Sequence, residues 1–349
     1  MKDTNLSADK TLFPFYTIPN FNDPFVNRKW GFLNSKGKIM LPPTFDYTGT
    51  FHEGLAPVVQ GQGDEKWGFV DPSGRWVIPE KYVAVEGFNC GRSPVCVGNE
   101  EHWGVIDISG NYIVQPGKYS RVYPYSEGMA IMVIGQIGKE GFCQGFIDTN
   151  GNVAVSPHFR YVRDFSEGLA AVAKLNPRPQ LWGFINKAGD FVVDPSFVAA
   201  DQFSEGLACV LKKPKAPWDF IDQVGNVIIS GVKCEEPTRF SEGLASIISD
   251  DGCGFIDKAG KWVIGPTKRY TKVFPFSCGR ACFEIVMFKN GEAEQLVGFI
   301  DKTGNEVIPA QFFTARNFEN DLCWIGLSMR FNAYIDKGGK FIWRADSPH

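Results

Sequence analysis

The sequence predicts an all-β protein: a tandem repeat of about nine short antiparallel β-meander units of about 36 residues each, forming a curved solenoid or, alternatively, a closed β-propeller-like ring. The stretch FSEGLA is repeated at 165–170, 203–208 and 240–245, with looser copies at 51–56 and 125–130. A WGF-like motif recurs in step with it, and a turn signature follows every copy of that motif. Periods of this length are typical of solenoids, propellers and repeat arrays.

The WGF-like motif marks one strand of each unit, because aromatic and β-branched residues favour strands. Nine copies begin at Trp30, Trp67, Trp103, Gln144, Trp182, Trp218, Cys253, Val297 and Ala333. Since four of these copies lack the Trp, we interpret the Trp as structural and not as a repeated platform for a ligand.

A hairpin turn follows each copy of the motif. Asp or Asn stands three residues before a Gly in all nine copies, for example in DPSG at 71–74 and DKTG at 301–304. The Asp or Asn side chain caps such a turn, and Gly takes the positive-φ position that closes it with a bulge. These acids are therefore predicted to be structural. A calcium loop would need further ligands at alternating positions, and these are missing.

The other strands flank these two elements. The runs WVIP at 76–79 and EVIP at 306–309 follow the turn, whereas LAPVV at 55–59 and LACVL at 207–211 follow the FSEGLA-like stretch. They complete a meander of three strands, and the aromatic linker between units offers a fourth short strand. A proline often follows the last strand, and we interpret it as the exit from that strand, because proline does not fit a central strand.

The FSEGLA-like stretches, here called joint segments, are predicted to connect neighbouring units. A small sheet with two faces does not bury itself, so the residues at the contact with its neighbour recur with the period. We expect the Phe to lie between neighbouring sheets, the Gly to permit a tight entry to the strand, and the Glu to accept backbone or indole N–H bonds from the adjacent unit. If Phe203 is buried, its replacement by Ala costs about 3–5 kcal/mol of stability.

Two joint segments differ from the others. They read FNCGRS at 88–93 and FSCGRA at 276–281, so Cys90 and Cys278 replace the Glu while Arg92 and Arg280 replace the Leu. In a third, FENDLC at 318–323, Asp321 replaces the Gly. The differences indicate sequence drift or, alternatively, two arginine-bearing units that line a binding face.

Three linked motifs carry a family resemblance. The combination of KWGF (66–69), FIDKTGNEVIP (299–309) and FSEGLA resembles the bacterial WG-repeat family, also called KWG repeats, over residues 21–349. The resemblance implies an all-β repeat protein that serves as an interaction module, with no catalytic residue in the repeat itself. Residues 1–20 are expected to be an N-terminal extension, and residues 21–349 a single elongated array.

Composition excludes several classes of function. The net charge is −3 with acids and bases interspersed, so no field draws the chain to nucleic acid or anionic lipid. No run of about 18 apolar residues is present to span a bilayer, and the N-terminus lacks the apolar region of a signal peptide. The nine cysteines include no CxxC motif and sit in strand-like runs. We therefore expect buried thiols and a cytoplasmic protein.

No catalytic, cofactor-binding or metal-binding residue is predicted. The four histidines, His52, His102, His158 and His349, lack the spacing of a metal site and are expected at the surface. Phosphate-binding glycine loops are absent. A basic segment at 211–220 carries Lys212, Lys213 and Lys215 beside Trp218, and it is either a solvated loop or a small contact for phosphate and a stacked base. The longest insertions, 134–146 and 288–299, fall in equivalent loops, where recognition is often found.

The expected function is a non-catalytic scaffold that binds a protein partner of unknown identity through the repeat surface. A sensor or immunity-type protein would be one form of it. The alternatives are a carbohydrate-binding repeat protein and, with less support, a hydrolase whose site is assembled between units. No membrane and no cofactor are expected, and nucleic acid is disfavoured as a partner.

Overall fold

The computed structural model of the chain describes residues 11–17, 28–61, 65–98, 102–136, 138–175, 180–235, 237–289, 291–328 and 331–345. Residues 1–10 and 18–20 of the expected N-terminal extension lie outside these ranges, as does His349. The chain divides into two compact units, unit 1 (Met1–Pro195) and unit 2 (Ser196–His349). The described residues form 33 β-strands and no helix, and every strand pairing in them is antiparallel. The predicted all-β fold class is confirmed.

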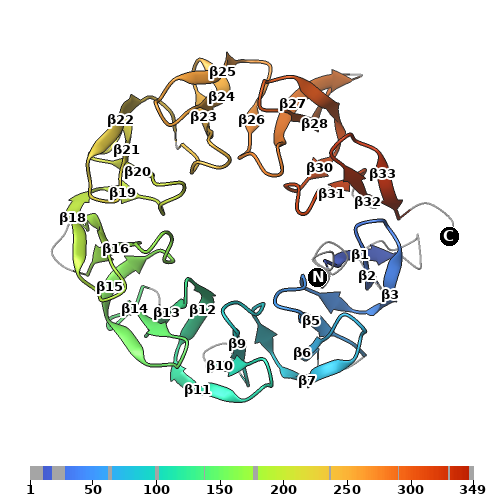
Figure 1. Ribbon diagram of the computed structural model, residues 1–349, viewed down its shortest axis with the longest axis vertical. Helices are drawn as coiled ribbons and strands as arrows, with labels where there is room; N and C mark the ends of the chain where they lie inside the picture. Colours follow the sequence, from blue (N-terminus) through green and yellow to red (C-terminus); the bar gives the residue numbers. More distant parts are fainter. Residues whose placement is uncertain are drawn as a thin grey trace, which may run out of the picture. The chain divides into compact units, whose positions relative to one another are not determined.

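Unit 1 contains sheets of three, four, four and seven strands, which follow one another in chain order (Figure 1). The first three sheets are β1(Phe13–Thr17), β2(Lys29–Leu33) and β3(Ile39–Phe45); β4(Tyr47–Thr48), β5(Ala56–Val59), β6(Trp67–Val70) and β7(Trp76–Tyr82); and β8(Ala84–Val85), β9(Arg92–Cys96), β10(Trp103–Asp107) and β11(Tyr112–Tyr119). The seven-stranded sheet is β12(Arg121–Ser126), β13(Met129–Ile134), β14(Cys143–Asp148), β15(Val153–Val162), β16(Ala170–Lys174), β17(Trp182–Ile185) and β18(Phe191–Phe197). The ten-residue strand β15 joins two repeats into this one sheet.

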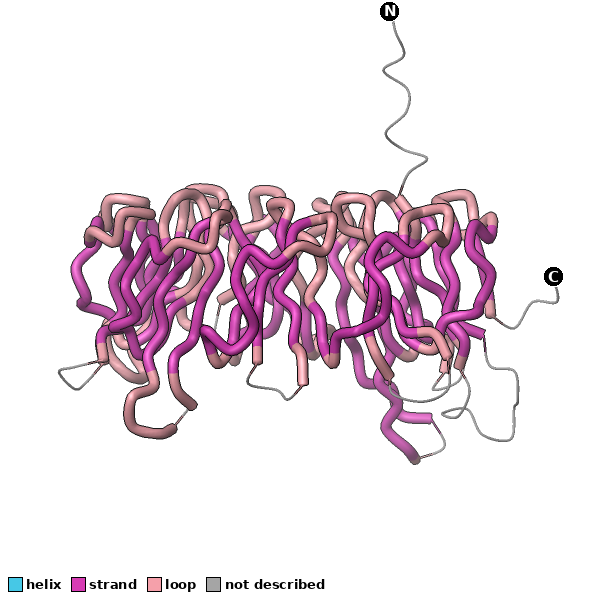
Figure 2. Tube along the Cα trace, turned by 90° about the horizontal axis from the view of Figure 1, so that it is seen from below, coloured by secondary structure: helices cyan, strands magenta, loops and turns pink. Residues whose placement is uncertain are grey.

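Unit 2 contains sheets of four, three, four and four strands. They are β19(Ala199–Ala200), β20(Ala208–Leu211), β21(Trp218–Ile221) and β22(Val227–Val232); β23(Ala245–Ser249), β24(Gly252–Ile256) and β25(Trp262–Thr267); β26(Lys272–Val273), β27(Ala281–Lys289), β28(Glu292–Ile300) and β29(Glu306–Phe312); and β30(Thr314–Ala315), β31(Leu322–Gly326), β32(Asn332–Asp336) and β33(Phe341–Arg344). Within each unit the strands run between two layers of turns (Figure 2).

All nine WGF-like copies lie on interior strands of their sheets: β2, β6, β10, β14, β17, β21, β24, β28 and β32. The predicted meander is confirmed, and most sheets add the short fourth strand at one edge. Two details differ from the expectation. Strand β1, inside residues 1–20, pairs with β2 and so belongs to the first sheet. In the last sheet, Tyr334 pairs with Trp343 as Phe69 pairs with Ile78, so Asn332 and not Ala333 stands at the Trp position.

The turn chemistry follows the prediction. In the β6–β7 hairpin, Asp71 Oδ1 accepts the backbone N–H groups of Ser73 (2.9 Å) and Arg75 (3.1 Å), and Gly74 has a φ of 83°. The hydrogen bond from the Ser73 hydroxyl lowers the pKa of Asp71 to about 2, and the backbone donors add to this effect. Asn34 makes the same two backbone contacts without a charge. These side chains therefore serve the turn.

The sequence predicted that a proline ends the last strand of the meander, and the structure contradicts this prediction. Pro79 lies inside β7 and Pro157 inside β15, each beside a shift in register with the WGF strand. A bulge leaves a position that donates no ladder hydrogen bond, so proline fits there and the strand continues. The bulge also crowds the middle of the WGF motif: a Cβ on Gly145 would lie 2.5 Å from the carbonyl oxygen of Val155.

The core lies between successive repeats and is centred on the joint segments. Phe88 of one joint packs against Phe69 of the preceding sheet, with ring centroids 4.9 Å apart, and both rings are buried. The same contact joins Phe146 with Phe165 in unit 1 and Phe220 with Phe240 in unit 2. Phe203 is also fully buried. The predicted role of the joint Phe is confirmed.

Candidate binding surface

The joint segments form tight two-residue turns whose side chains hold the next unit. In the joint at 165–170, Ser166 and Leu169 exchange backbone hydrogen bonds, and Glu167 and Gly168 have φ values of 55° and 82°. Positive φ at both central residues defines the type I′ hairpin turn. In other joints the Ser hydroxyl donates to the carbonyl oxygen of the next joint Phe, as in Ser126–Phe165, Ser204–Phe240, Ser241–Phe276 and Ser277–Phe318.

The joint Glu accepts backbone N–H groups from the next joint, as predicted. The donor is the joint Gly in the pairs Glu53–Gly91, Glu127–Gly168, Glu205–Gly243 and Glu242–Gly279. Three of these carboxylates also meet a lysine from a hairpin turn, in Glu127–Lys187, Glu205–Lys258 and Glu242–Lys302. Burial raises the pKa of Glu205, but the hydrogen bonds from Lys258 and Gly243 outweigh it and lower the pKa overall. We call these contacts the clamps.

The two joints with Cys and Arg use a different clamp. Arg92 Nε donates to the carbonyl oxygen of Thr149 at 2.6 Å, and Arg280 Nε donates to that of Lys337 at 3.1 Å. Thr149 and Lys337 stand at the turn position that carries lysine in the Glu clamps. The guanidinium groups are therefore engaged in joining repeats, which contradicts the alternative that they line a binding face.

The other sequence candidates give no site. His52, His102 and His158 are exposed, as expected. Within the described residues, no three His, Cys, Asp or Glu side chains gather in a way that could hold a metal ion. Trp218 is buried and donates its indole N–H to the carbonyl oxygen of Glu235, so its face is not open for stacking on a base. No described helix is present to cross a membrane.

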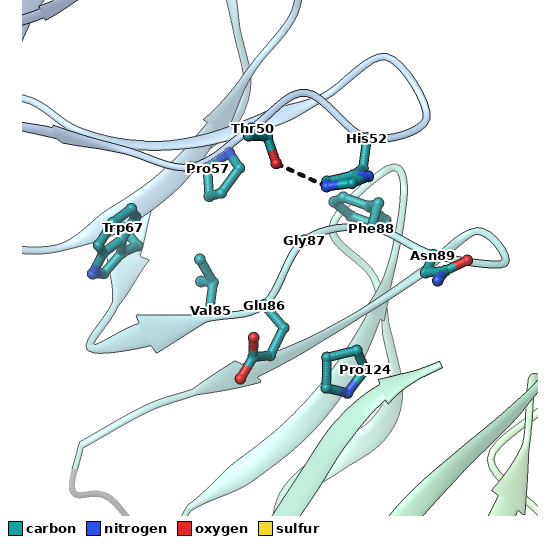
Figure 3. Close-up of a pocket in the computed structure, with 11 residues that line it drawn as sticks. Thr50, His52, Pro57, Trp67, Val85, Glu86, Gly87, Phe88, Asn89 and Pro124 are labelled. Atoms are coloured by element: carbon teal, nitrogen blue, oxygen red, sulfur yellow. Dashed lines mark hydrogen bonds between the residues drawn. The ribbon is translucent and has the colours of Figure 1, made fainter. Parts of the chain in front are cut away.

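Two neighbouring cavities lie in unit 1, on either side of strand β8. The first, of about 430 Å³, is lined by Trp67, His52, Glu86, Asn89 and residues around them. Figure 3 shows Trp67 and Asn89 at opposite ends of this cavity, with Val85 and Glu86 between them. Thr50 and His52 form a side-chain hydrogen bond of 2.8 Å at its rim.

The second cavity has a volume of about 630 Å³. Its lining combines apolar and aromatic groups with polar ones: Ala84, Cys96, Trp103, Arg121, Tyr123 and Gln136. Gly135 and Gln136 belong to the insertion at 134–146, which the sequence marked as a recognition loop.

An ion pair separates the two cavities. The Glu86 carboxylate, which lines the first, bonds to the guanidinium of Arg121, which lines the second. Arg121 lies over the Trp103 ring at 3.7 Å from its centroid and over Tyr123 at 5.3 Å. The Glu86 backbone is held by Pro94 and by the hydroxyl of Ser93. The two cavities and the Glu86–Arg121 pair are here called the β8 site.

Sequence reasoning did not find the β8 site. Trp67 and Trp103 were recognised only as repeat residues, and Glu86, Arg121 and Tyr123 were not singled out. The one signal in the sequence was the insertion at 134–146, since its first residues border the second cavity.

A family model for the WG containing repeat matches residues 30–63, 67–100, 103–136, 145–176, 182–213, 254–285 and 298–326. The chain belongs to the WG-repeat family. The matched segments each begin near a WGF-like copy and run through the following joint, so the family unit coincides with the structural repeat. None of the curated proteins matches this WG-repeat protein.

Solved structures resemble the WG-repeat protein in fold. A crystal structure of the eukaryotic initiation factor is 12% identical, covers 96% of both chains and superposes with a TM-score of 0.62. Hsv2 from Kluyvelomyces marxianus is 9% identical and covers 71% of this chain and 94% of its own, with a TM-score of 0.41. BamB from Moraxella catarrhalis is 11% identical and covers 90% and 96%, with a TM-score of 0.37. At these identities the likeness of the first structure supports the all-β repeat fold alone.

Proposed function

We propose that this WG-repeat protein is a non-catalytic scaffold of the bacterial cytoplasm that binds a protein partner through the β8 site. The observation that carries the proposal is the pair of adjoining cavities, with an arginine stacked on two aromatic rings between them. Trp, Tyr and Arg are the side chains that most often dominate binding energy at protein interfaces.

The chemistry of the β8 site fits a side chain of a protein better than a strongly charged ligand. Glu86 and Arg121 neutralise each other, so a neutral apolar or aromatic group from the partner suits the second cavity. Tyr123 offers a hydroxyl group for a hydrogen bond to the backbone of that partner. A sensor or immunity-type role is the specific form that we propose, in which the recognised partner is a foreign protein.

The repeat acids support a role without catalysis. Asp71 and Glu205 both accept backbone N–H groups, and the equivalent residues of other repeats do the same. Their carboxylates are thus used to hold turns and clamps.

The test is recovery of the partner from native cytosol with the tagged protein, with and without nuclease, followed by binding measurements on the identified partner. We expect one protein at near-equal molar amount, unaffected by nuclease. Tyr123→Ala should then weaken its binding by roughly tenfold or more, because aromatic anchors are frequent hot spots. Tyr161→Ala is the matched control, since Tyr161 is an exposed tyrosine of unit 1 outside both cavities.

Equal loss of binding in both tyrosine variants, or in neither, would contradict the β8 site as the contact. Recovery of the protein without any partner would argue against the scaffold itself.

A saccharide is the second candidate, and the first cavity favours it. The Trp67 ring, with Asn89, Glu86 and His52 nearby, combines an aromatic face with donors and acceptors for hydroxyl groups. Retention on a polysaccharide resin that is lost in Trp67→Ala but kept in Trp182→Ala would support it. Trp182 is the matched control because it occupies the same repeat position.

A further inference from the structure

The β27–β28 hairpin of unit 2 differs from the equivalent hairpins. Each of its strands has nine residues, whereas β5, β6, β20 and β21 have four. The register extends without interruption from the pair Ala281–Ile300 to the pair Lys289–Glu292. The hairpin therefore projects beyond its sheet (Figure 2).

The projecting part of this hairpin is a ribbon with two open edges. Strand β26 pairs with β27 only at Phe283 and Glu284, and β29 pairs with β28 only from Val297 onward. Among the described residues, Ile285–Lys289 and Glu292–Leu296 thus pair only with each other. Open strand edges offer rows of backbone N–H and C=O groups to another strand.

The apolar residues at the end of β27 are unusually exposed. Val286 is 43% exposed, Met287 50% and Phe288 78%, the highest value among the large apolar residues of the described chain. Beyond Glu284, β27 continues with four apolar residues and ends on one charged residue, Lys289. The opposite strand is acidic, with Glu292 and Glu294 both exposed.

We propose that the open edge of β27 pairs antiparallel with the β27 edge of a second copy of this chain. Charge decides between the two edges. Self-pairing along β28 would set Glu292 and Glu294 of one copy beside those of the other, and like charges on facing strands are destabilising. Self-pairing along β27 brings apolar side chains together and sets no like charges opposite each other, because Lys289 of one copy falls opposite Ile285 of the other.

The backbone fixes the register of this pairing. Thr271 N donates to Glu284 O and Phe274 N donates to Cys282 O, so even-numbered residues of β27 direct their backbone groups toward the open edge. The free groups beyond Glu284 are therefore those of Val286 and Phe288. A two-fold axis at Met287 pairs Val286 of each copy with Phe288 of the other, and each pair exchanges both of its backbone hydrogen bonds. The Met287 residues then face each other as a non-hydrogen-bonded pair.

The proposed contact is small, so the dimer is weak and forms at high protein concentration. In this dimer the apolar β27 edge of each copy is covered by the other copy. The acidic β28 edge stays open, and repulsion between its glutamates prevents further copies from pairing along it. The inference concerns unit 2 and is independent of the partner proposed for unit 1.

Cysteine cross-linking tests the register. Met287→Cys should give a disulfide-linked dimer on mild oxidation, because the facing non-hydrogen-bonded positions lie within the Cα separation that a disulfide spans. Glu294→Cys is the matched control, since Glu294 lies directly opposite Met287 on β28 and equally near the tip. The unmodified chain is oxidised alongside, and the bond between the introduced thiols is located by peptide mass spectrometry. Equal cross-linking of the two variants, or none in Met287→Cys, overturns the proposal.

Sedimentation equilibrium tests the association itself. The unmodified chain should pass from monomer to dimer as its concentration rises, and Phe288→Glu should weaken dimerisation by roughly tenfold or more. Because Phe288 is largely exposed, its replacement should leave thermal unfolding of the monomer unchanged. A chain that stays monomeric, or a dimer that Phe288→Glu leaves intact, overturns the proposal.

Discussion

The joint Phe carries much of the contact between neighbouring sheets. In unit 2, Phe240 is buried against Phe220 with ring centroids 5.1 Å apart, in an edge-to-face arrangement. Phe240 belongs to the same buried cluster as Ile247 and Ile256, which lie in the next sheet. Phe240 therefore links two sheets, and its loss leaves a cavity that neither sheet fills alone.

Phe240→Ala should lower the free energy of unfolding by about 3–5 kcal/mol, because a buried ring is removed and a cavity remains. Denaturant unfolding followed by circular dichroism measures the change. Phe313→Ala is the control, since Phe313 is 47% exposed and its removal should cost about 0.5 kcal/mol or less. Similar losses in both variants would show that the joint Phe is not a special contact.

The turn acids make stability depend on pH. The pKa of Asp71 is lowered to about 2 in the folded chain, first by the Ser73 hydroxyl. A carboxyl whose pKa is lowered by folding contributes stability above its unfolded pKa of about 3.9, and this contribution is lost as the pH falls toward 2. Asp71→Asn should keep the turn, because Asn34 and Asn186 make the same contacts.

We therefore expect Asp71→Asn to be less sensitive to acid than the unmodified chain. The free energies of unfolding of the variant and of the unmodified chain should become more similar as the pH is lowered from 6 to about 2.5. The unmodified chain loses the contribution of the Asp71 carboxylate as this group takes up its proton, and the variant has no such contribution to lose. A constant difference across this range would mean that folding does not change the pKa of Asp71.

At the scale of the strand, a bulge and a glycine depend on each other. The strand after each hairpin turn bulges, often at proline, and its carbonyl then approaches the Gly of the WGF motif. Where β22 lacks the proline, Asp219 replaces this Gly and its carboxylate accepts the N–H of Gly231. The sequence shows the glycine of the WGF motif and the proline of the following strand, but it does not show that the two positions lie in contact. A proline that ends a strand and a proline that sits in a bulge give the same sequence pattern.

Gly254→Ala and Gly265→Ala provide a matched test within one sheet. A Cβ on Gly254 would lie 2.5 Å from the carbonyl oxygen of Ile264, whereas one on Gly265 meets nothing within 4 Å. Gly254→Ala should cost about 1–3 kcal/mol of stability, as overpacking does, and Gly265→Ala should be close to neutral. Chemical denaturation of both variants measures the difference, and a neutral Gly254→Ala would disprove the close approach.

Across the whole molecule, the state of the cysteines follows from burial. All nine thiols are free; Cys96, Cys209, Cys253, Cys282 and Cys323 are buried, and Cys90, Cys143, Cys234 and Cys278 are partly exposed. Burial raises the pKa of the Cys323 thiol to about 12 and raises that of Cys282 as well. Because the thiolate is the reactive form, buried thiols with a raised pKa react slowly.

Thiol titration of the native chain near pH 8 should detect no more than the four partly exposed cysteines in its fast phase. The five buried ones should react only as the chain unfolds, and all nine should react in denaturant. Peptide mapping identifies the labelled residues. Rapid labelling of Cys282 or Cys323 in the native chain would contradict their burial.

The repeat architecture could be predicted because every unit repeats its own signals. The Asp and Gly of the turns, the joint Phe and the WGF strand each recur, so the same local signals predict the same structure in every repeat. The β8 site could not be predicted in this way, because Glu86, Arg121 and Tyr123 are not repeated and meet only after two sheets pack. The extra length of β27 was visible as an insertion, but its open edges depend on where β26 and β29 stop pairing.

The clamps also restrict how a gene for this chain could gain or lose repeats. Recombination between the identical segments 203–208 and 240–245 would delete one unit and leave Glu205 facing Gly279 and Lys302, the partners that Glu242 has now. An exchange between 240–245 and the variant joint 276–281 would instead direct Glu242 toward Asp321, with both carboxylates competing for Lys337. We expect changes in repeat number to be tolerated between identical joints and selected against where the joints differ.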